Sequence, residues 1–334
     1  MYRYETHLHT APVSKCATAG VREQLLFYRD LGYDGVFITN HFLDGNINID
    51  KTLPYEEQLT FYLSDYYDAR AEAGKIGIKV FFGVELSNRG TDFLVYNLTP
   101  EWYYAHPEIM TLGKKEELAL MRAEGAFIVH AHPFREAGYI DHIRLYPRSV
   151  DAVEVNNAAR DDFTNALADQ YADNFGFFKT GGSDNHAGFA RHLAGMECDV
   201  PIETEKDYEN LVREGRAHVF TLDPDEARFE RAAFADGCVT VRLKTNPTTG
   251  YGWEWESSGE RAPGLISEEH TAEGALCGAP GFVKYVFRPE KPGKYEMIFR
   301  YRRPWESAVP LRTFTVRFEL KEDGKITRKF HDFC

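Results

Sequence analysis

The sequence lacks the features that mark disulfide-rich or membrane-spanning proteins. It has five cysteines in 334 residues and no Cys-x-x-Cys pair, so neither a disulfide framework nor a cysteine zinc knuckle is expected. No run of about 18 apolar residues, the length that a transmembrane helix needs, occurs anywhere. The first residues do not have the basic segment and apolar run of a signal peptide. We therefore expect no membrane partner and a cytoplasmic location.

Positive charge is also in short supply. The 39 Lys and Arg residues are outnumbered by 52 Asp and Glu residues, which gives a formal net charge of −13. This excess argues against duplex nucleic acid or an anionic membrane as the main partner. An anionic substrate would have to be attracted by a local charge, such as a bound metal ion. The hydrophobic content of 43% is ordinary for a globular protein, and the length predicts about two domains.

The sequence pattern changes near residue 225. Before it, short apolar runs alternate with amphipathic helical stretches, as in the predicted helix over residues 20–32 and the strand over 35–39. This alternation predicts a parallel α/β sheet or barrel. After it, apolar residues alternate with period two and helical periodicity is absent, which is typical of an antiparallel β-sandwich. We therefore predict domains over residues 1–224 and 225–334.

Candidate metal ligands follow the strand-like runs of the first domain. His7 and His9 lie two residues apart, so in a strand their side chains point to the same side. The loops after the carboxyl ends of strands in α/β folds meet at one face, where sites are built. Imidazole and carboxylate suit zinc, iron or manganese, and a shared carboxylate can bridge two ions. The candidates are His7, His9, His41, Glu85, His130, His132, Asp184 and His186.

The order of five motifs resembles the PHP (polymerase and histidinol phosphatase) family over about residues 1–220. The motifs are Thr6-His7-Leu8-His9-Thr10, Ile38-Thr39-Asn40-His41, Gly83-Val84-Glu85, Ala131-His132-Pro133 and Ser183-Asp184-Asn185-His186. The resemblance implies a distorted (β/α)7 barrel with two or three divalent metal ions, zinc, iron or manganese, that hydrolyses phosphate esters through a metal-bound hydroxide. It implies a first metal held by His7, His9, Glu85 and Asp184, a second by Glu85 and His132, and a third by His41 and His186.

The chain departs from the family after the first motif. The family usually has a His or Asp ligand there, whereas this chain reads Ser14-Lys15-Cys16. Either Cys16 takes the place of that ligand or the third metal is weak or missing. Lys15 is a candidate contact for a substrate phosphate, because its ammonium acts as a point charge.

Three further residues complete the predicted site. Asp92 stands where many relatives carry a histidine after the Gly-Val-Glu motif, and we expect it to ligate the second metal. His132 is preferred to His130 because it directly precedes a proline, as in the family. Arg135 is a candidate phosphate clamp, since its planar fork matches phosphate oxygens; a surface ion pair is the alternative interpretation.

The second domain contains three loops rich in Gly, Pro and aromatic residues. On composition alone they are ordinary sandwich loops or a contact surface. The strings Asn-Pro-Thr-Thr-Gly-Tyr, Gly-x-x-Gly and Arg-Pro-Trp, in this order, resemble the chagasin family of cysteine-peptidase inhibitors over about residues 228–320. The resemblance implies an all-β immunoglobulin-like sandwich whose loops plug the cleft of papain-like proteases. The implied contact residues are Asn246, Thr249, Gly250, Tyr251, Gly278, Gly281, Arg303 and Trp305.

The main functional hypothesis is hydrolysis of a small phosphomonoester or a nucleotide-type phosphoester. The alternative from another class is a binding protein, in which the sandwich captures a papain-like cysteine protease or another protein and the barrel is a scaffold. A third hypothesis is a metal-dependent hydrolase of another bond, such as an amide.

Overall fold

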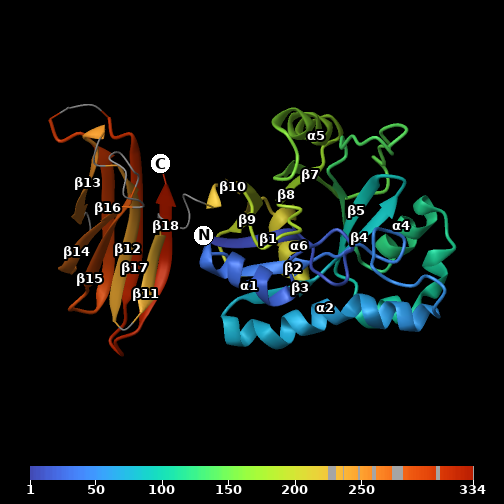
Figure 1. Cartoon of the computed structure of the whole chain (residues 1–334), viewed down its shortest axis with the longest axis horizontal. Coiled ribbons are helices and arrows are strands. Elements are labelled where there is room, and N and C mark those ends of the chain that lie inside the picture. Colours follow the sequence, from blue (N-terminus) through green and yellow to red (C-terminus); the bar gives the residue numbers. More distant parts are fainter. Residues whose placement is uncertain are drawn as a thin grey trace. The chain divides into compact units, whose positions relative to one another are not determined.

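A computed structural model describes residues 1–224, 231–235, 237–246, 249–257, 261–272, 281–305 and 309–333. The chain divides into two compact units, one spanning Tyr2–Pro224 and the other Asp225–Cys334 (Figure 1). No helix in the described part of the chain is both long and apolar enough to cross a membrane.

The N-terminal unit contains two five-stranded sheets. In the first, the strand order is β10-β9-β1-β2-β3, and in the second it is β4-β5-β6-β7-β8. The first sheet consists of β1 (Tyr2–Leu8), β2 (Gly35–Ile38), β3 (Lys79–Phe82), β9 (Leu193–Cys198) and β10 (Ala217–Leu222). The second consists of β4 (Val84–Asn88), β5 (Thr91–Tyr96), β6 (Phe127–Ala131), β7 (Ala152–Asn157) and β8 (Phe178–Gly182).

Both sheets are mixed, so the parallel arrangement predicted from the sequence holds for some of the strand pairs and not for the others. The pairs β1–β2, β2–β3, β6–β7 and β7–β8 are parallel, whereas β4–β5, β5–β6, β1–β9 and β9–β10 are antiparallel. Residues 79–84, one short apolar run in the sequence, are divided at Gly83 between β3 in the first sheet and β4 in the second. A Cβ atom on Gly83 would lie 2.7 Å from Thr39 Cγ2 and 3.1 Å from the Tyr96 ring, so these two side chains leave no room for a side chain at residue 83.

Six α-helices and a short 3-10 helix connect the strands of this unit. They are α1 (Val21–Asp30), α2 (Tyr55–Ile76), α3 (Pro100–Ala105), α4 (Lys114–Ala123), α5 (Asp162–Phe175), α6 (Glu205–Arg213) and the 3-10 helix Pro107–Met110. Local signals explain several boundaries: Asp161 and Thr204 cap the N-termini of α5 and α6, and Gly77 and Gly176 end α2 and α5 in the left-handed conformation.

Backbone hydrogen bonds join the carboxyl-terminal ends of β1, β2 and β8 and the start of β4. The amide of Thr39, after β2, donates to Leu8 of β1 at 3.0 Å, and the amide of Glu85 in β4 donates to Asn40 at 3.2 Å. On the other side, the amide of His9 donates to Asn185, after β8, at 3.0 Å. Side chains that follow β1, β2 and β8 therefore meet side chains of β4, although these four segments are far apart in the sequence.

The C-terminal unit is formed by two four-stranded antiparallel sheets, with strand orders β11-β12-β15-β14 and β13-β16-β17-β18. Their strands are β11 (Arg231–Ala235), β12 (Cys238–Thr245), β13 (Gly252–Ser257), β14 (Gly264–Ala272), β15 (Gly281–Arg288), β16 (Gly293–Arg302), β17 (Arg312–Leu320) and β18 (Ile326–Phe333). Alternate residues such as Val239, Val241 and Leu243 are buried in one core with Phe299 and Phe314 of the other sheet. The all-β prediction for this region is confirmed.

Candidate metal centre

The imidazoles of His7 and His9 both project from the end of β1 into the interior. Neither side chain is exposed. His7 Nδ1 lies 2.9 Å from Glu154 Oε1, and His9 Nδ1 lies 3.1 Å from Ser14 Oγ. In both rings the other nitrogen, Nε2, is buried and forms no hydrogen bond within the described residues. Each ring is thus held by one nitrogen and presents the other to the same centre.

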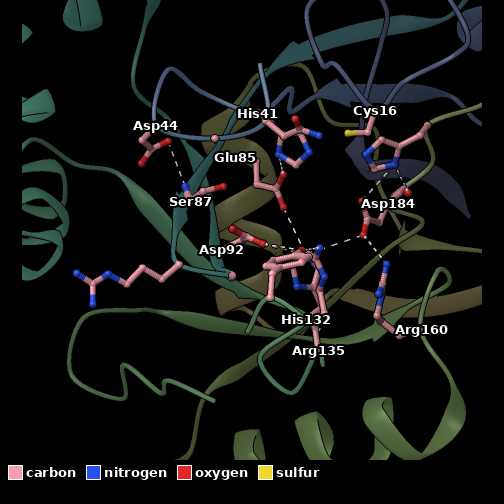
Figure 2. Close-up of a pocket in the computed structure, with 16 residues that line it drawn as sticks. Cys16, His41, Asp44, Glu85, Ser87, Asp92, His132, Arg135, Arg160 and Asp184 are labelled. Carbon is pink, nitrogen blue, oxygen red and sulfur yellow. Dashed lines mark hydrogen bonds and ion pairs between the residues drawn. The ribbon is translucent and has the colours of Figure 1, made fainter. Parts of the chain in front are cut away.

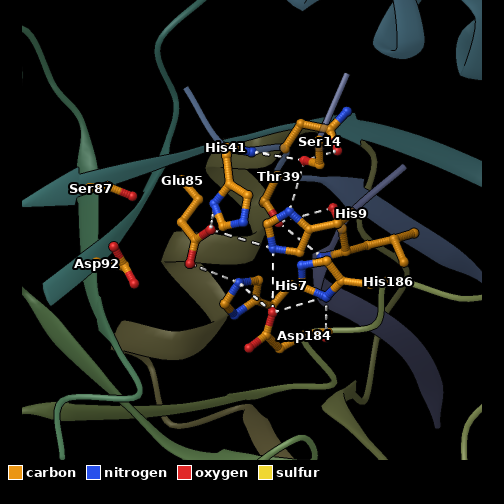
Figure 3. A network of polar contacts seen from close by, with 12 residues as sticks. His7, His9, Ser14, Thr39, His41, Glu85, Ser87, Asp92, Asp184 and His186 are labelled. Carbon is orange, nitrogen blue, oxygen red and sulfur yellow. Dashed lines mark hydrogen bonds and ion pairs between the residues drawn. The ribbon is translucent and has the colours of Figure 1, made fainter. Parts of the chain in front are cut away.

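Glu85 occupies that centre (Figure 3). Its carboxylate oxygens lie 3.2 Å from His7 Nε2, 3.4 Å from His9 Nε2, 2.5 Å from His41 Nδ1 and 3.4 Å from His132 Nε2. Burial acts to raise the pKa of Glu85, but the imidazoles of His41, His7 and His9 hold it well below its usual range. The result is a buried carboxylate anion surrounded by four nitrogen donors.

Asp184 and His132 approach the same centre from strained backbone positions. Asp184 Oδ1 lies 3.6 Å from His7 Nε2 and 3.4 Å from His9 Nε2. The φ angles are 51° at Asp184 and 27° at His132, in the left-handed region that non-glycine residues rarely adopt. Such strain costs about 1–3 kcal/mol and is concentrated at functional sites. The amide of His132 donates to Glu154 Oε2 at 3.0 Å, which helps to hold this conformation.

The donor atoms fit divalent metal ions. Three groups of side chains have one donor atom each within 4.8 Å of one another: His7, Glu85 and His132; His7, His9 and Asp184; and His9, His41 and His186. Both oxygens of Glu85 and the Nε2 atoms of His7 and His9 form no hydrogen bond with the part of the chain that is described. Buried polar atoms without partners are costly, whereas coordination of a cation would satisfy them.

The pKa values of the neighbouring His7 and His9 rings are shifted in opposite directions. Burial lowers the pKa of His7, but the carboxylates of Glu154, Asp184 and Glu85 raise it well above the usual value. Burial and the imidazoles of His186 and His41 instead hold the pKa of His9 well below the usual value. Because a metal ion binds the neutral ring, metal binding would release the proton of His7.

Of the two histidines near the end of β6, the structure brings His132 to the centre. His130 points elsewhere and stacks on Phe93, with ring centroids 5.2 Å apart. Neither ring nitrogen of His130 has a hydrogen bond in the described residues. Burial and the nearby His132 lower its pKa to about 3, so this ring is neutral.

The centre opens into a cavity of about 530 Å³ (Figure 2). Asp92 lies at its wall, with Oδ2 3.9 Å from His132 Nε2 and 3.0 Å from Arg135 Nη1. Arg135 also lines the cavity, and its ion pair with Asp92 engages one of its nitrogens. Its role as a phosphate contact stays a prediction. Lys15 is exposed and is not among the residues that line the cavity, whereas Cys16 is. The structure therefore does not support a phosphate contact by Lys15.

Sequence reasoning missed two residues of the site. Glu154, within β7, binds both His7 and the amide of His132, yet in the sequence it is only one polar residue in an alternating strand. Arg160 lies 3.6 Å from Asp184 Oδ2 and lines the cavity. Its position three residues after β7 was a usable signal, because His41, His132 and Asp184 also follow strand ends.

Two of the predicted contact loops of the C-terminal unit lie side by side. The guanidinium of Arg303 lies 4.7 Å from the centre of the Tyr251 ring, and its Nε donates to the Thr249 carbonyl at 3.2 Å. A Cβ atom on Gly250 would lie 2.8 Å from the Trp305 ring, which is itself 70% exposed. Among the other predicted residues, the Asn246 amide donates to the Tyr301 hydroxyl at 3.0 Å, Gly281 begins β15, and Gly278 lies outside the described residues.

The C-terminal unit is thus a two-sheet β unit with neighbouring loops rich in glycine and aromatic residues. Residues 236–319 match the chagasin family of peptidase inhibitors, I42. Amoebiasin-2 from Entamoeba histolytica is 31% identical over 102 residues, which cover 29% of this chain and 80% of that protein. Amoebiasin-1 from the same organism is 28% identical over 83 residues, 24% of this chain and 79% of that protein. Through its C-terminal unit, the chain belongs to the chagasin family.

Solved structures are similar to both parts of the chain. The cysteine protease inhibitor EhICP2 from Entamoeba histolytica is 31% identical, with 24% of this chain and 75% of that chain covered and a TM-score of 0.22. A Bifidobacterium adolescentis protein assigned as a metal-dependent phosphoesterase is 13% identical and has a TM-score of 0.39. The match covers 55% of this chain and 87% of that chain. PsfC from Pseudomonas syringae is 16% identical and has a TM-score of 0.43. The match covers 68% of this chain and 94% of that chain.

Proposed function

We propose that the N-terminal unit is a metal-dependent phosphoesterase with a distorted (β/α)7 barrel, which hydrolyses a small phosphomonoester or a nucleotide-type phosphoester. The observation that carries the proposal is Glu85, a buried carboxylate with no hydrogen bond to a described residue and four imidazoles within 3.4 Å. A carboxylate in this environment suits the bridge between two cations.

The donor groups divide into positions for two or three ions of zinc, iron or manganese. We assign His7, His9, Glu85 and Asp184 to the first position, Glu85, His132 and Asp92 to the second, and His41 and His186 to the third. Bound ions would supply a water molecule of lowered pKa and compensate for the charge that develops on the phosphoryl oxygens.

The protein itself orients the ligands and the substrate. Glu154 holds His7 by Nδ1, so that Nε2 faces the centre. Arg135 and Arg160 line the cavity, and each is already attracted to a site carboxylate, Asp92 at 3.0 Å and Asp184 at 3.6 Å. With cations bound at those carboxylates, the two guanidinium groups would be available to bind phosphate oxygens.

Metal depletion and reloading tests this proposal. The protein is stripped with a chelator, reloaded separately with zinc, ferrous iron or manganese, and assayed on phosphomonoesters, phosphodiesters and amides. We expect phosphoester hydrolysis that requires reloading and is lost in Asp184→Asn, together with bound metal. Asp169→Asn, at a half-exposed carboxylate that does not line the cavity, is the control. The proposal fails if no reloaded form cleaves a phosphoester; cleavage of the amides alone would support the amide-hydrolase alternative instead.

We infer a second function for the C-terminal unit, inhibition of a papain-like cysteine protease. Its membership of the chagasin family and the 70% exposure of Trp305 beside Gly250 support this function. Exposed aromatic residues on adjacent loops are typical anchors of protein interfaces. Papain titrated with the protein should lose activity, and Trp305→Ala should weaken the inhibition by about 30-fold or more. Leu265→Ala, at an exposed residue of β14, should not change it. Full papain activity at micromolar protein would exclude this function.

A further inference from the structure

Three imidazoles meet on one side of the cavity, where the third metal position is proposed. The ring centroid of His9 lies 4.3 Å from that of His41 and 4.1 Å from that of His186. Nε2 of His9 is fully buried and forms no hydrogen bond in the described part of the chain. His9 also belongs to the group with His7 and Asp184. If His9 ligates the metal ion held by His7 and Asp184, an ion between His41 and His186 needs another donor.

Cys16 offers a further donor on this side of the cavity. It lines the cavity together with His41 and His186. Figure 2 shows it on the same rim of the cavity as His41. Asp44 is a less suitable donor, because Lys114 Nζ lies 2.7 Å from one of its oxygens and the Ser87 amide donates to the other at 3.2 Å.

The backbone on both sides of Cys16 is fixed against the site. The amide of Thr18 donates to the His186 carbonyl at 2.7 Å, and the amide of Lys15 donates to the Asn46 carbonyl at 2.9 Å. Ser14 Oγ lies 3.1 Å from His9 Nδ1 and accepts a hydrogen bond from the His41 amide at 3.1 Å. The loop that carries Cys16 is therefore bonded to the ring of His9 and to the backbone of His41 and His186, so the backbone of Cys16 is held beside these three residues.

We propose that Cys16 is a thiolate ligand of the third metal position, beside His41 and His186. The inference rests on the proposed metal centre and specifies its donor set as two nitrogens and one sulfur. When the sulfur–metal bond forms, the S–H bond breaks and the proton passes to solvent. A thiolate favours zinc, ferrous iron or cobalt over manganese and magnesium. Three protein ligands leave one coordination position open, as in catalytic rather than structural zinc sites.

Cobalt(II) substitution tests the proposal without relying on activity. Metal-free protein is saturated with cobalt(II), and its near-ultraviolet absorption is recorded with the amount of bound cobalt. We expect a thiolate-to-cobalt charge-transfer band in the wild type. Cys16→Ser and His186→Ala should each lose the band and one equivalent of cobalt, whereas Cys238→Ser, in the other unit, should keep both. The proposal is overturned if the saturated wild type lacks the band or Cys16→Ser retains it.

Thiol labelling of the wild type provides a second test that needs no variant. Cys16 is exposed, so iodoacetamide should alkylate it in metal-free protein, and zinc should abolish this reaction while labelling of Cys238 is unchanged. Equal labelling of Cys16 with and without zinc, at full metal occupancy, would refute the proposal. The Cys16 proposal and the phosphoesterase proposal can fail separately. Hydrolysis without the cobalt band would refute only the proposal that Cys16 is a ligand, and the band without hydrolysis would refute only the proposed phosphoesterase activity.

Discussion

At the residue scale, Glu154 supports the candidate site without being one of its proposed ligands. Its two oxygens bind His7 Nδ1 at 2.9 Å and the His132 amide at 3.0 Å, and the second oxygen also accepts a hydrogen bond from Asn157 at 2.9 Å. A carboxylate on the outer nitrogen of a ligand imidazole fixes the ring and raises its basicity. Glu154 is 1% exposed, so water cannot replace it in this role.

We expect Glu154→Gln to weaken metal binding. The amide side chain has nearly the same shape but lacks the negative charge, and metal affinity should fall by about 10- to 100-fold. Competition with a chromophoric chelator measures the affinity. Glu124→Gln, at an exposed carboxylate after α4, is the matched control and should bind metal as the wild type does. Equal affinity in both variants would show that Glu154 does not tune the site.

A second prediction at this scale concerns Glu117 in α4, which is 4% exposed. Burial raises its pKa from 4.5 to about 7, although Lys114 lies 2.6 Å away. The folded state therefore holds this proton more tightly than the unfolded chain. The stability that this group contributes is complete below pH 4.5 and is lost as the pH rises through about 7.

Glu117→Gln is neutral at every pH and should remove this dependence. Between about pH 5 and pH 8, the free energy of unfolding of the wild type should fall relative to the variant by up to about 3 kcal/mol. Urea unfolding followed by helical circular dichroism measures it, because α1–α6 all belong to the N-terminal unit. Glu116→Gln, on the exposed side of the same helix, should parallel the wild type. A constant difference across this pH range would disprove the prediction.

At the element scale, the close approach of β8 to β1 builds the centre. A Cβ atom on Gly182, the last residue of β8, would lie 2.5 Å from His7 Cβ and 2.9 Å from Glu154 Oε1. Thr6 Oγ1 donates to the Gly181 carbonyl at 2.7 Å, and the Ser183 amide donates to Glu5 Oε1 at 2.9 Å. These contacts leave no room for a side chain between the two strands.

Gly182→Ala should therefore separate the strands and displace His7. We expect a loss of about 1–3 kcal/mol of unfolding free energy, as for overpacked cores, together with a loss of bound metal.

Gly74→Ala is the opposite case, because Gly74 lies within α2 and its new methyl group would meet nothing within 4 Å. It should stabilise the protein by about 0.5–1 kcal/mol. Urea unfolding and metal analysis measure both variants; normal metal content in Gly182→Ala would contradict the argument.

At the scale of the whole molecule, the two proposed functions belong to separate compact units. Each unit has its own core, and no residue assigned to the metal centre belongs to the contact loops. The chain therefore combines a proposed hydrolase with a member of an inhibitor family in one polypeptide. Separate cores allow each activity to be removed without unfolding the other unit.

We expect the two activities to be lost independently. Asp184→Asn should abolish metal-dependent hydrolysis and leave papain inhibition unchanged, because Asp184 acts only in the N-terminal unit. Trp305→Ala should weaken papain inhibition and leave hydrolysis unchanged for the corresponding reason. Assays of both activities on both variants measure this independence. A substantial change of hydrolysis in Trp305→Ala, or of inhibition in Asp184→Asn, would instead reveal coupling between the units.

The sequence by itself determined the kinds of residue at the centre and the change of architecture along the chain. Ligand types and their positions after strand ends are local properties, which can be read without knowing the partners. For the same reason, period-two alternation after residue 225 predicted the all-β region. The strings around Asn246 and Trp305 identified the chagasin resemblance, which the family match over residues 236–319 confirms.

Only the tertiary structure decided which residues meet. The antiparallel pairs of β4, β5, β9 and β10 depend on hydrogen bonds between distant segments, which hydrophobic periodicity does not record. His130 and His132 are equivalent by spacing, and the positive φ of His132 separates them. Lys15 and Cys16 are neighbours in sequence, yet only Cys16 lines the cavity. Glu154 acquires its role through contacts with residues 22 and 147 positions away. Long-range contacts set these features, and a local pattern contains no information about them.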